Sequence, residues 1–490
     1  MIEEEAARRA RAELLRQREI EPYPAKSQYT HTITDYLAKF DQLMADQTVE
    51  TVVGRIITLR KHGGLTFLTL EDGTGRIQLV LRKDGVGEET YQFFHATMDM
   101  GDFIQATGCA FLTKKEEKSL DVQHYKILAK TLLPMPEKWH GLSDVEVRYR
   151  QRYLDLLSNP SVRHIFKVRA LIIKTIRQFL DERDFLEVET PVLQAIPGGA
   201  NAAPFITHHN ALDIDLYLRI APELFLKRCV VGGLDRVYEI ARCFRNEGID
   251  HAHNPEFTQI EGYIAYRDYE QLMEMLEEML KEVIRAVGLD PFQVPFQDYQ
   301  LNFAERWERI TFREAMLRYA ALDIETITNR ETAVQAAVKH GVPVEKNHGL
   351  GTIIDNLYKH LVRPKIIQPT FIYDYPAQLS PLAKKKADDP RYVEMFQLVY
   401  GGGEENMKSF SELNDPLDQE ARFQEQQAAR EAGDDEAQFA DDDYVTALKH
   451  GLPPTAGFGI GIDRLTALLT NSSNIKEVIL FPTLRPKSQE

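Results

Sequence analysis

Residues 242–266, RCFRNEGIDHAHNPEFTQIEGYIAY, hold the densest set of ionisable and polar side chains at regular spacing. Two stretches of alternating polarity flank a segment with Gly and Asn, which predicts a two-stranded hairpin. Arg245, Glu247, Glu261 and Tyr263 fall on odd positions, so they can share one sheet face. Polar groups where a core is expected indicate a ligand site. The structural alternative, an exposed face of paired charges, is less favoured because the preceding residues predict buried structure.

A second segment, GFGIGIDRL at residues 457–465, has glycines that permit a strand and a helix start to approach a ligand closely. Arg464 in the first helical turn would then point at an anion. Tight packing is the structural alternative. The segment lacks a complete G-x-G-x-x-G pattern, and the chain has no G-x-x-x-x-G-K-[ST] loop. These absences disfavour a Rossmann dinucleotide site and exclude a P-loop NTPase.

The elements that must position these residues predict a large α+β domain from residue 145 to residue 490. Amphipathic helices alternate with strands there, which is typical of an antiparallel sheet flanked by helices. A helix-rich stretch at about 311–362 predicts an insertion. Two prolines within residues 132–142 interrupt helical and strand patterns, so we place a linker at 133–144.

Residues 46–132 have a different pattern, with five short runs of β-branched and alternating residues. A DGTG turn at 72–75 predicts a hairpin, and the regular spacing predicts a small β unit such as the five-stranded oligonucleotide-binding (OB) barrel. If the strands pair in order, Arg60, Phe67 and Gln78 share its open face. An aromatic ring can stack on a base there, while a guanidinium and an amide read base edges. From this segment alone, a core position for Phe67 is slightly favoured.

Composition limits the class of protein. The 490 residues are 43% hydrophobic and 27% charged, as in ordinary globular proteins. A net charge of −16 opposes non-specific attraction to phosphate backbones, so a nucleic-acid partner must meet local basic patches. The three cysteines form no C-x-x-C pair, and no signal segment or long apolar run is present. These features predict a cytoplasmic protein that does not span a membrane.

Residues 1–45 predict a helical extension, in which residues 3–18 are rich in Ala, Glu, Arg and Leu. A solvated helix is favoured there over a nucleic-acid-binding arm.

In chain order, these segments resemble the class II aminoacyl-tRNA synthetases, and more narrowly the bacterial-type lysyl-tRNA synthetases of class IIb. FRNEGI and HNPEFTQIE resemble motif 2, GIGIDRL with FPTLRP resembles motif 3, and FLDERDFLEVETP resembles motif 1, the dimer interface of that class. PGGANAAPFITHH, SPLAKK, FSELNDP and GRIQLVL are also similar, so the resemblance covers nearly the whole chain.

The resemblance implies an ATP- and Mg²⁺-dependent lysine:tRNA ligase that forms lysyl-adenylate and then charges tRNA(Lys), working as a homodimer. Its ATP site would comprise Arg245, Glu247, His253, Phe257 and Arg464, with Arg245, Glu247 and Arg464 as the catalytic candidates. Its lysine site would comprise Gly199, Glu223, Arg245, Glu261, Tyr263 and Glu412. Glu404 or Glu405 would bind the metal, and Arg60, Phe67 and Gln78 would read the anticodon, which reverses the preference for Phe67 as core.

Four positions depart from the family pattern. Ala252 and Ala203 stand where arginines are usual, Gln397 replaces a glutamate that helps to hold magnesium, and Lys408 aligns with an asparagine. Two like charges ~4 Å apart at an effective dielectric of ~20 repel by about 4 kcal/mol. We therefore expect Lys408 to turn away from a bound lysine and pair with Glu404 or Glu405.

Two rival functions remain open from the sequence. An aspartyl- or asparaginyl-type synthetase shares the layout, although its pocket should offer cations to the substrate side chain, whereas Glu412 is an anion. A non-catalytic RNA-binding or regulatory paralogue would account for Ala252 and Gln397. The joint presence of Arg245, Glu247, Phe257, Glu404 and Arg464 argues against it.

Overall fold

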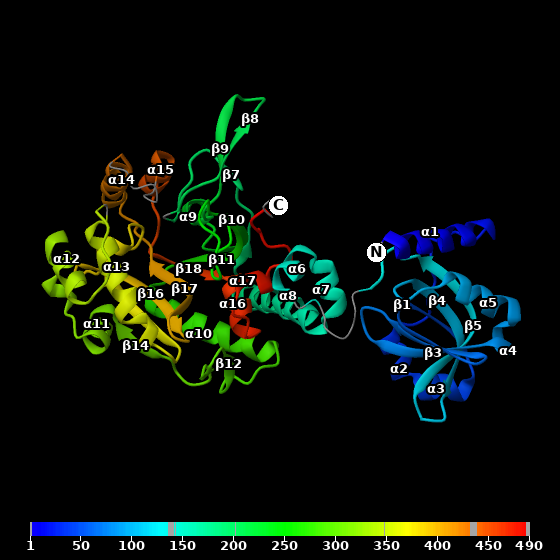
Figure 1. Cartoon of the computed structure of the whole chain (residues 1–490). Helices are drawn as coiled ribbons and strands as arrows, with labels where there is room; N and C mark the ends of the chain where they lie inside the picture. The colour runs from blue at the N-terminus through cyan, green and yellow to red at the C-terminus, as the bar shows by residue number, and fades with distance from the viewer. Residues whose placement is uncertain are drawn as a thin grey trace. The chain divides into compact units, whose positions relative to one another are not determined.

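The computed structural model describes residues 2–135, 142, 144–200, 202–346, 348–431 and 439–486. The chain divides into two compact units, Met1–Gly141 and Leu142–Glu490, shown in Figure 1. Most of the predicted linker at 133–144 lies outside the described residues. Each unit has its own hydrophobic core, so each is described by itself.

The first unit contains a closed five-stranded barrel in the order β1-β2-β3-β5-β4. Its strands are β1 (Val49–His62), β2 (Leu65–Glu71), β3 (Arg76–Arg82), β4 (Phe103–Leu112) and β5 (Lys118–Ala129). The predicted hairpin is confirmed, because Asp72 Oδ1 accepts from the backbone N–H groups of Thr74 and Gly75 in the turn between β2 and β3. The five strands expected from the sequence are thus all present, and they close into the OB fold.

Helices cover parts of this barrel. They are α1 (Ile2–Gln17), α2 (Ile33–Ala38), α3 (Phe40–Asp46), α4 (Lys83–Val86) and α5 (Glu88–Thr97). The expectation that α1 is solvated is wrong for one of its faces. Ala12 and Leu15 are buried, and Arg8, only 4% exposed, donates to Thr131 Oγ1 at 2.8 Å. A short apolar stripe on an otherwise charged helix is enough to dock it.

An eight-stranded sheet in the order β14-β15-β16-β17-β18-β11-β10-β6 forms the centre of the second unit. Its strands are β6 (Leu186–Glu187), β10 (Arg236–Phe244), β11 (Glu256–Ala265), β14 (Glu308–Thr311), β15 (Thr370–Pro376), β16 (Tyr392–Tyr400), β17 (Glu404–Ser411) and β18 (Thr455–Gly461). The inner pairs are antiparallel, and the two edge pairs, β14 with β15 and β6 with β10, are parallel. The predicted antiparallel α+β domain is confirmed.

Two separate cores lie on the two faces of this sheet. Phe371 and Ile372 are adjacent on β15, yet they belong to different cores because successive side chains of a strand point to opposite faces. One core includes residues of α8 (Pro160–Asp181), α10 (Tyr269–Ala286) and α16 (Ile462–Leu469). The other includes α9 (Glu223–Val231), α11 (Phe312–Ala320), α12 (Arg330–Lys339) and α13 (Leu350–Leu361), three of which fall within the predicted helical insertion at 311–362.

Smaller elements complete the unit. The helices are α6 (Val145–Arg150), α7 (Arg152–Ser158), α14 (Pro416–Glu431), α15 (Asp442–Lys449) and α17 (Ile475–Val478). A three-stranded sheet joins β7 (Leu193–Gln194), β9 (Ile214–Leu218) and β8 (Ile206–His209), and β12 (Val294–Phe296) pairs with β13 (Tyr299–Leu301). These two small sheets are separate from the eight-stranded one.

Candidate active site

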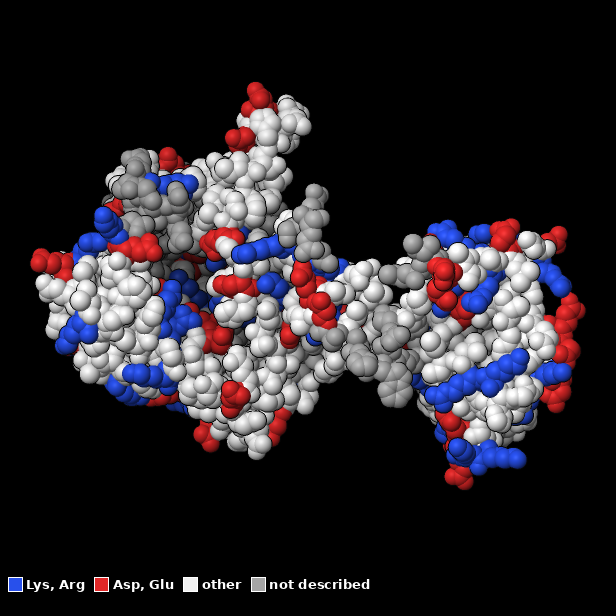
Figure 2. All heavy atoms as spheres, viewed as in Figure 1, with Lys and Arg blue, Asp and Glu red and all other residues white. Residues whose placement is uncertain are grey.

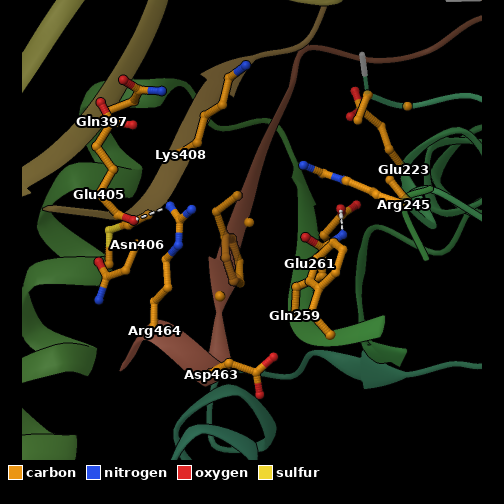
Figure 3. A pocket seen from close by; sticks show the side chains of 18 of the residues that line it. Glu223, Arg245, Gln259, Glu261, Gln397, Glu405, Asn406, Lys408, Asp463 and Arg464 are labelled. Atoms are coloured by element: carbon orange, nitrogen blue, oxygen red, sulfur yellow. Dashed lines mark hydrogen bonds between the residues drawn. The ribbon is translucent and has the colours of Figure 1, made fainter. Parts of the chain in front are cut away.

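A cavity of about 450 Å³ opens on the sheet of the second unit, between the β10–β11 hairpin and strands β17 and β18. Figure 3 shows side chains entering it from several strands. Most of the residues predicted for the ATP, lysine and metal sites line it: Gly199, Glu223, Arg245, Glu247, His253, Phe257, Glu261, Tyr263, Glu405 and Arg464. Glu404 and Glu412 are not on its wall.

The strand register explains why acidic and phenolic groups gather at one end. Glu261 and Tyr263, two residues apart on β11, face the same side, and β18 places Gly459 and Gly457 directly opposite them. A Cβ added to Gly457 would lie 2.3 Å from Glu412 Oε1 and 2.4 Å from the Tyr263 ring. The glycines of the GFGIG segment therefore leave room for protein side chains, as well as for a ligand.

Glu261 is a buried carboxylate without a cation within ion-pair distance among the described side chains. It accepts from Gln259 Nε2 at 2.6 Å and from the Tyr263 hydroxyl at 3.3 Å. Burial raises the pKa of Glu261 to about 8, and the nearby Glu223 carboxylate acts in the same direction. An amino group carried by a ligand would stabilise the charged form of this carboxylate.

Lys227 on α9 is the site residue that the sequence reasoning missed. Its buried ammonium lies 2.5 Å from Glu223 Oε1 and 2.5 Å from Glu412 Oε2. Burial alone would lower the pKa of Lys227, but the two carboxylates outweigh it and the pKa is raised. The four-residue spacing from Glu223 on a helix was an available signal for the first contact. The second contact, between α9 and the residue that follows β17, had no local signal.

Glu412 consequently differs from its predicted role. Its side chain is fully buried and its charge is balanced by Lys227. The residue that faces the cavity beside it is Phe410. The predicted direct contact between Glu412 and a substrate ammonium thus stays a prediction, and Glu412 instead holds Lys227 behind the cavity wall.

Glu223 itself, at the start of α9, remains on the cavity wall. Gly199 adjoins it with φ of +88°, and a Cβ there would lie 2.9 Å from the Glu223 Cβ. This close approach brings the Gly199 backbone beside the carboxylate, where both can face one ligand group.

Arg245 and Arg464 bring cationic groups to the middle and to the opposite end of the cavity. The Arg245 backbone N–H donates to Pro255 O at 2.8 Å, and its guanidinium carbon lies 5.0 Å from the centre of the Phe257 ring. Arg464 Nη1 donates to Glu405 O at 2.8 Å, and Arg464 Nη2 lies 3.3 Å from His253 Nε2. Arginines and an aromatic ring on one wall suit a nucleotide, because guanidinium groups bind phosphate oxygens.

The fit of a Mg²⁺ ion depends on Glu405 and Asn406 at the start of β17. Burial raises the pKa of Glu405, while Arg363, whose Nε lies 3.4 Å from Glu405 Oε1, acts in the opposite direction. Neither amide atom of the buried Asn406 has a hydrogen-bond partner in the described structure. Hard oxygen donors beside phosphate suit Mg²⁺. Within the described residues, no three His, Cys, Asp or Glu side chains converge on a metal position.

Of the two metal candidates, Glu405 lines the cavity and Glu404 does not. Gln397 lines it too, and its Oε1 accepts from the Tyr375 hydroxyl at 2.7 Å. The residues present therefore fit a metal held by one carboxylate together with substrate oxygens.

Lys408 corrects a sequence-based expectation. It does not turn away or pair with Glu404 or Glu405, but lines the cavity, and no ion pair of its ammonium occurs among the described side chains. The strand period puts Lys408 on the same face as Phe410, whereas Glu405 is three residues away and pairs with Arg363. Ala252 lines the cavity as well, and the Ala203 carbonyl accepts from Asn246 N at 2.8 Å.

In the first unit, the predicted anticodon residues share one barrel face. Arg60 is the register partner of Phe67, and Gln78 is the partner of Thr69, two residues from Phe67. Arg60 is exposed, while Phe67 and Gln78 are half-buried on the outside of the barrel. On the face seen in Figure 2, basic side chains lie among acidic ones on this unit. This arrangement matches the expected open face, and the core alternative for Phe67 is wrong.

Comparison with known proteins agrees with the fold described for each of the two units. Residues 144–485 match the family of tRNA synthetases class II (D, K and N), and residues 50–128 match the OB-fold nucleic acid binding domain. The chain belongs to the class II tRNA synthetase family. Relatives named lysine–tRNA ligase include those of Roseiflexus castenholzii, 50% identical over 98% of this chain and 98% of the relative, and Pelotomaculum thermopropionicum, 48% identical over 98% and 94%.

A third such relative of this class II synthetase, from Moorella thermoacetica, is 48% identical over 99% of this chain and 98% of its own length. None of the helices in the described ranges has the length and apolar character needed to cross a bilayer.

Proposed function

We propose that this protein is a lysine–tRNA ligase, which joins lysine to its tRNA at the expense of ATP. The observation that carries the proposal is a single cavity with Glu223, Glu261 and Tyr263 at one end, Arg464 at the other, and Arg245 between them. A ligand with two amino groups and a carboxylate suits the first end, and a triphosphate suits the second. Membership of the class II family and whole-length relatives of that name support this function.

The chemistry follows from this placement. A carboxylate oxygen of lysine attacks the α-phosphorus of ATP, the bond from that phosphorus to the bridging oxygen of pyrophosphate breaks, and lysyl-adenylate forms. Arg245, between the two ends, would contact the carboxylate and the α-phosphate where negative charge develops. The 3′-terminal ribose hydroxyl of the tRNA then attacks the acyl carbon, and AMP leaves with its electron pair. Positioning and charge stabilisation suffice, so no protein nucleophile is needed.

Around the nucleotide, Phe257 would stack on adenine, Glu247 and His253 would position it, and Arg464 would face the γ-phosphate. A Mg²⁺ ion held by Glu405 and phosphate oxygens would neutralise phosphate charge when bound. Around the amino acid, Gly199 and Glu223 would bind the α-ammonium.

The side-chain ammonium would then meet Glu261 and Tyr263. Both are buried and lie on the cavity wall. Glu412 would act through Lys227, which it holds in place.

In the first unit, Arg60, Phe67 and Gln78 would read the anticodon of tRNA(Lys). A half-buried ring on an OB face can stack on one base. We also propose a cytoplasmic location, because tRNA is used in translation there.

A homodimer is proposed through the region of motif 1 and the small β7–β9–β8 sheet. Large apolar side chains are exposed across this region: Leu186, Val192, Leu193, Ile196, Ile206, Leu212 and Ile214. Apolar surface of this kind is typical of a subunit interface. Sedimentation analysis should give twice the mass of one chain, and Ile206→Glu should shift the protein toward the monomer. A monomeric wild-type protein would contradict the dimer.

The central test is pyrophosphate exchange into ATP with each amino acid in turn. Lysine should support exchange, and the other amino acids should support little. Lys408 in the cavity is the one observation that favours an acidic substrate, so aspartate and glutamate are the decisive competitors. Better exchange with either would overturn the lysine assignment while leaving the adenylate chemistry intact.

A further inference from the structure

The ammonium of Lys408 is a cation on the cavity wall that the described part of the chain leaves without a carboxylate partner. Three other cations of this region are already engaged. Lys227 pairs with Glu223 and Glu412, Arg363 pairs with Glu405, and Arg464 donates to the Glu405 carbonyl. The Lys408 Nζ lies 5.7 Å from the centre of the Phe410 ring.

Its direct neighbour across the sheet is neutral. Lys408 on β17 is the register partner of Gln397 on β16. The Gln397 amide oxygen is occupied by the Tyr375 hydroxyl at 2.7 Å. On the other side, the register partner of Lys408 is Gly459 on β18, so neither neighbouring strand places a charged side chain directly opposite Lys408.

Lys408 lies between the two ends of the cavity. Its side chain rises from the wall that also carries Gln397 and Glu405, and Arg245 extends from the other side toward the same space, as Figure 3 shows. Glu223 is on the Arg245 side of that space. Two cationic groups thus face the region where the amino-acid end meets the phosphate end.

The Lys408 side chain is exposed to the cavity, so its ammonium faces open space rather than a carboxylate of the described residues. An anionic oxygen group of a ligand would supply the missing charge. Ala252, on the same cavity wall, contributes no cation of its own.

We propose that Lys408 binds an anionic oxygen group of the substrates, opposite Arg245, at the point where carboxylate and phosphate react. This inference rests on the proposed function for the identity of those substrates. The shared chemistry is an oxyanion, and it has two sources: the α-carboxylate of the amino acid and the phosphates of ATP. Lys408 is on this view a substrate-binding residue, not a residue that selects the amino-acid side chain.

Equilibrium binding to the full-length protein separates the two sources. Binding of ATP with Mg²⁺, of lysine, and of lysinamide, which lacks the carboxylate, is measured on wild type, Lys408→Asn and Lys408→Arg. Loss of a charge-assisted hydrogen bond corresponds to an affinity fall of ~10-fold or more in Lys408→Asn. If the phosphates are the source, ATP binding falls and lysine binding does not. If the carboxylate is the source, lysine binding falls and lysinamide binding does not.

Controls keep the result interpretable. Lys408→Arg should retain most of the affinity, because it keeps the positive charge. Lys449→Asn removes an exposed lysine of α15 that pairs with Glu420 at 3.4 Å, and should change neither affinity. One ligand should still bind Lys408→Asn with wild-type affinity and so show that the site is folded. If the carboxylate is the source, that ligand is lysinamide. If the phosphates are the source, that ligand is lysine.

Unchanged ATP and lysine affinities in Lys408→Asn would overturn the inference. So would a fall in lysinamide affinity equal to that of lysine, because Lys408 would then act on the side-chain end. A different measurement tests the proposed function: it would be contradicted if the wild-type protein showed no lysine-dependent pyrophosphate exchange.

Discussion

The barrel face of the first unit and the cavity of the second unit both carry polar residues predicted to meet a substrate, yet they hold them differently. Arg60, Phe67 and Gln78 lie on the outside of the barrel, near water. Glu261 and Lys227 are buried, and burial or a buried partner shifts the pKa of each. Stacking and base reading need only shape and accessible donors, whereas stabilising charge during a reaction requires groups removed from water. Variants in the two regions should therefore fail in different ways.

The largest effect is expected at Lys227. Lys227→Met leaves Glu223 and Glu412 buried without their cation, and removing one partner of a buried pair costs ~3–5 kcal/mol of stability. Hydrogen exchange of the full-length protein should show faster exchange in the second unit and an unchanged barrel. Lys449→Met, in an exposed pair, is the matched control. Equal protection in Lys227→Met and wild type would mean that the buried triad contributes little.

Arg245→Ala should reduce pyrophosphate exchange by ~10²-fold or more, the scale for losing one preorganised donor to developing negative charge. The control is Arg242→Ala, three residues earlier on β10, which is exposed and paired with Glu256 at 3.3 Å. A wild-type rate of pyrophosphate exchange in Arg245→Ala would show that the adenylate does not form in this cavity. Charging of tRNA should fall in parallel, since no adenylate would be available.

Glu261→Gln should weaken lysine binding by ~10-fold or more, since a buried charge-assisted contact is lost. Gln keeps the shape and can still accept from Gln259, so folding should be little affected. Calorimetry with lysine and with ATP gives the contrast, because ATP binding should not change. Equal weakening for both ligands would instead indicate general damage to the site.

The same carboxylate predicts a pH dependence. Because the pKa of Glu261 is about 8, the group is mostly protonated at pH 7, and binding an ammonium must release a proton. Lysine affinity should therefore increase from pH 6.5 to about pH 8 and then level off, below the pKa of ~10.4 of a free lysine side chain. Glu223, Lys227, Arg245 and Tyr263 also face this group, so the profile in Glu261→Gln is needed as the reference. A profile unchanged by Glu261→Gln would assign the titration to another group.

The smallest effect is expected on the barrel. Stacking of one base contributes ~1–3 kcal/mol, so Phe67→Ala should weaken tRNA charging while leaving pyrophosphate exchange at the wild-type level. Phe103→Ala, whose ring lies 4.1 Å from the Arg55 guanidinium carbon elsewhere on the barrel, should leave charging unchanged. Equal charging by Phe67→Ala and wild type would make this face structural only.

Sequence reasoning was most successful where one strand or one turn determines the result. The hairpin at Asp72 and the shared face of Glu261 and Tyr263 follow from turn chemistry and the two-residue strand period. The contact of Lys227 with Glu412 joins residues far apart in the chain, so no local pattern indicates it. The direction of the Lys408 side chain depends on which strand lies beside β17. The Glu405 carboxylate, which was expected to pair with Lys408, pairs instead with Arg363, a residue outside that strand.

The tight packing around Gly457 has a consequence for mutational tolerance. Every amino acid other than glycine carries a Cβ, and each single-base missense change of a glycine codon therefore places a carbon against Glu412 and Tyr263. Every amino-acid replacement of Gly457 should therefore disturb this end of the cavity. Gly73, in an open turn where a Cβ meets nothing within 4 Å, is the contrasting case. In a saturation library selected for growth, diversity should disappear at 457 and persist at 73.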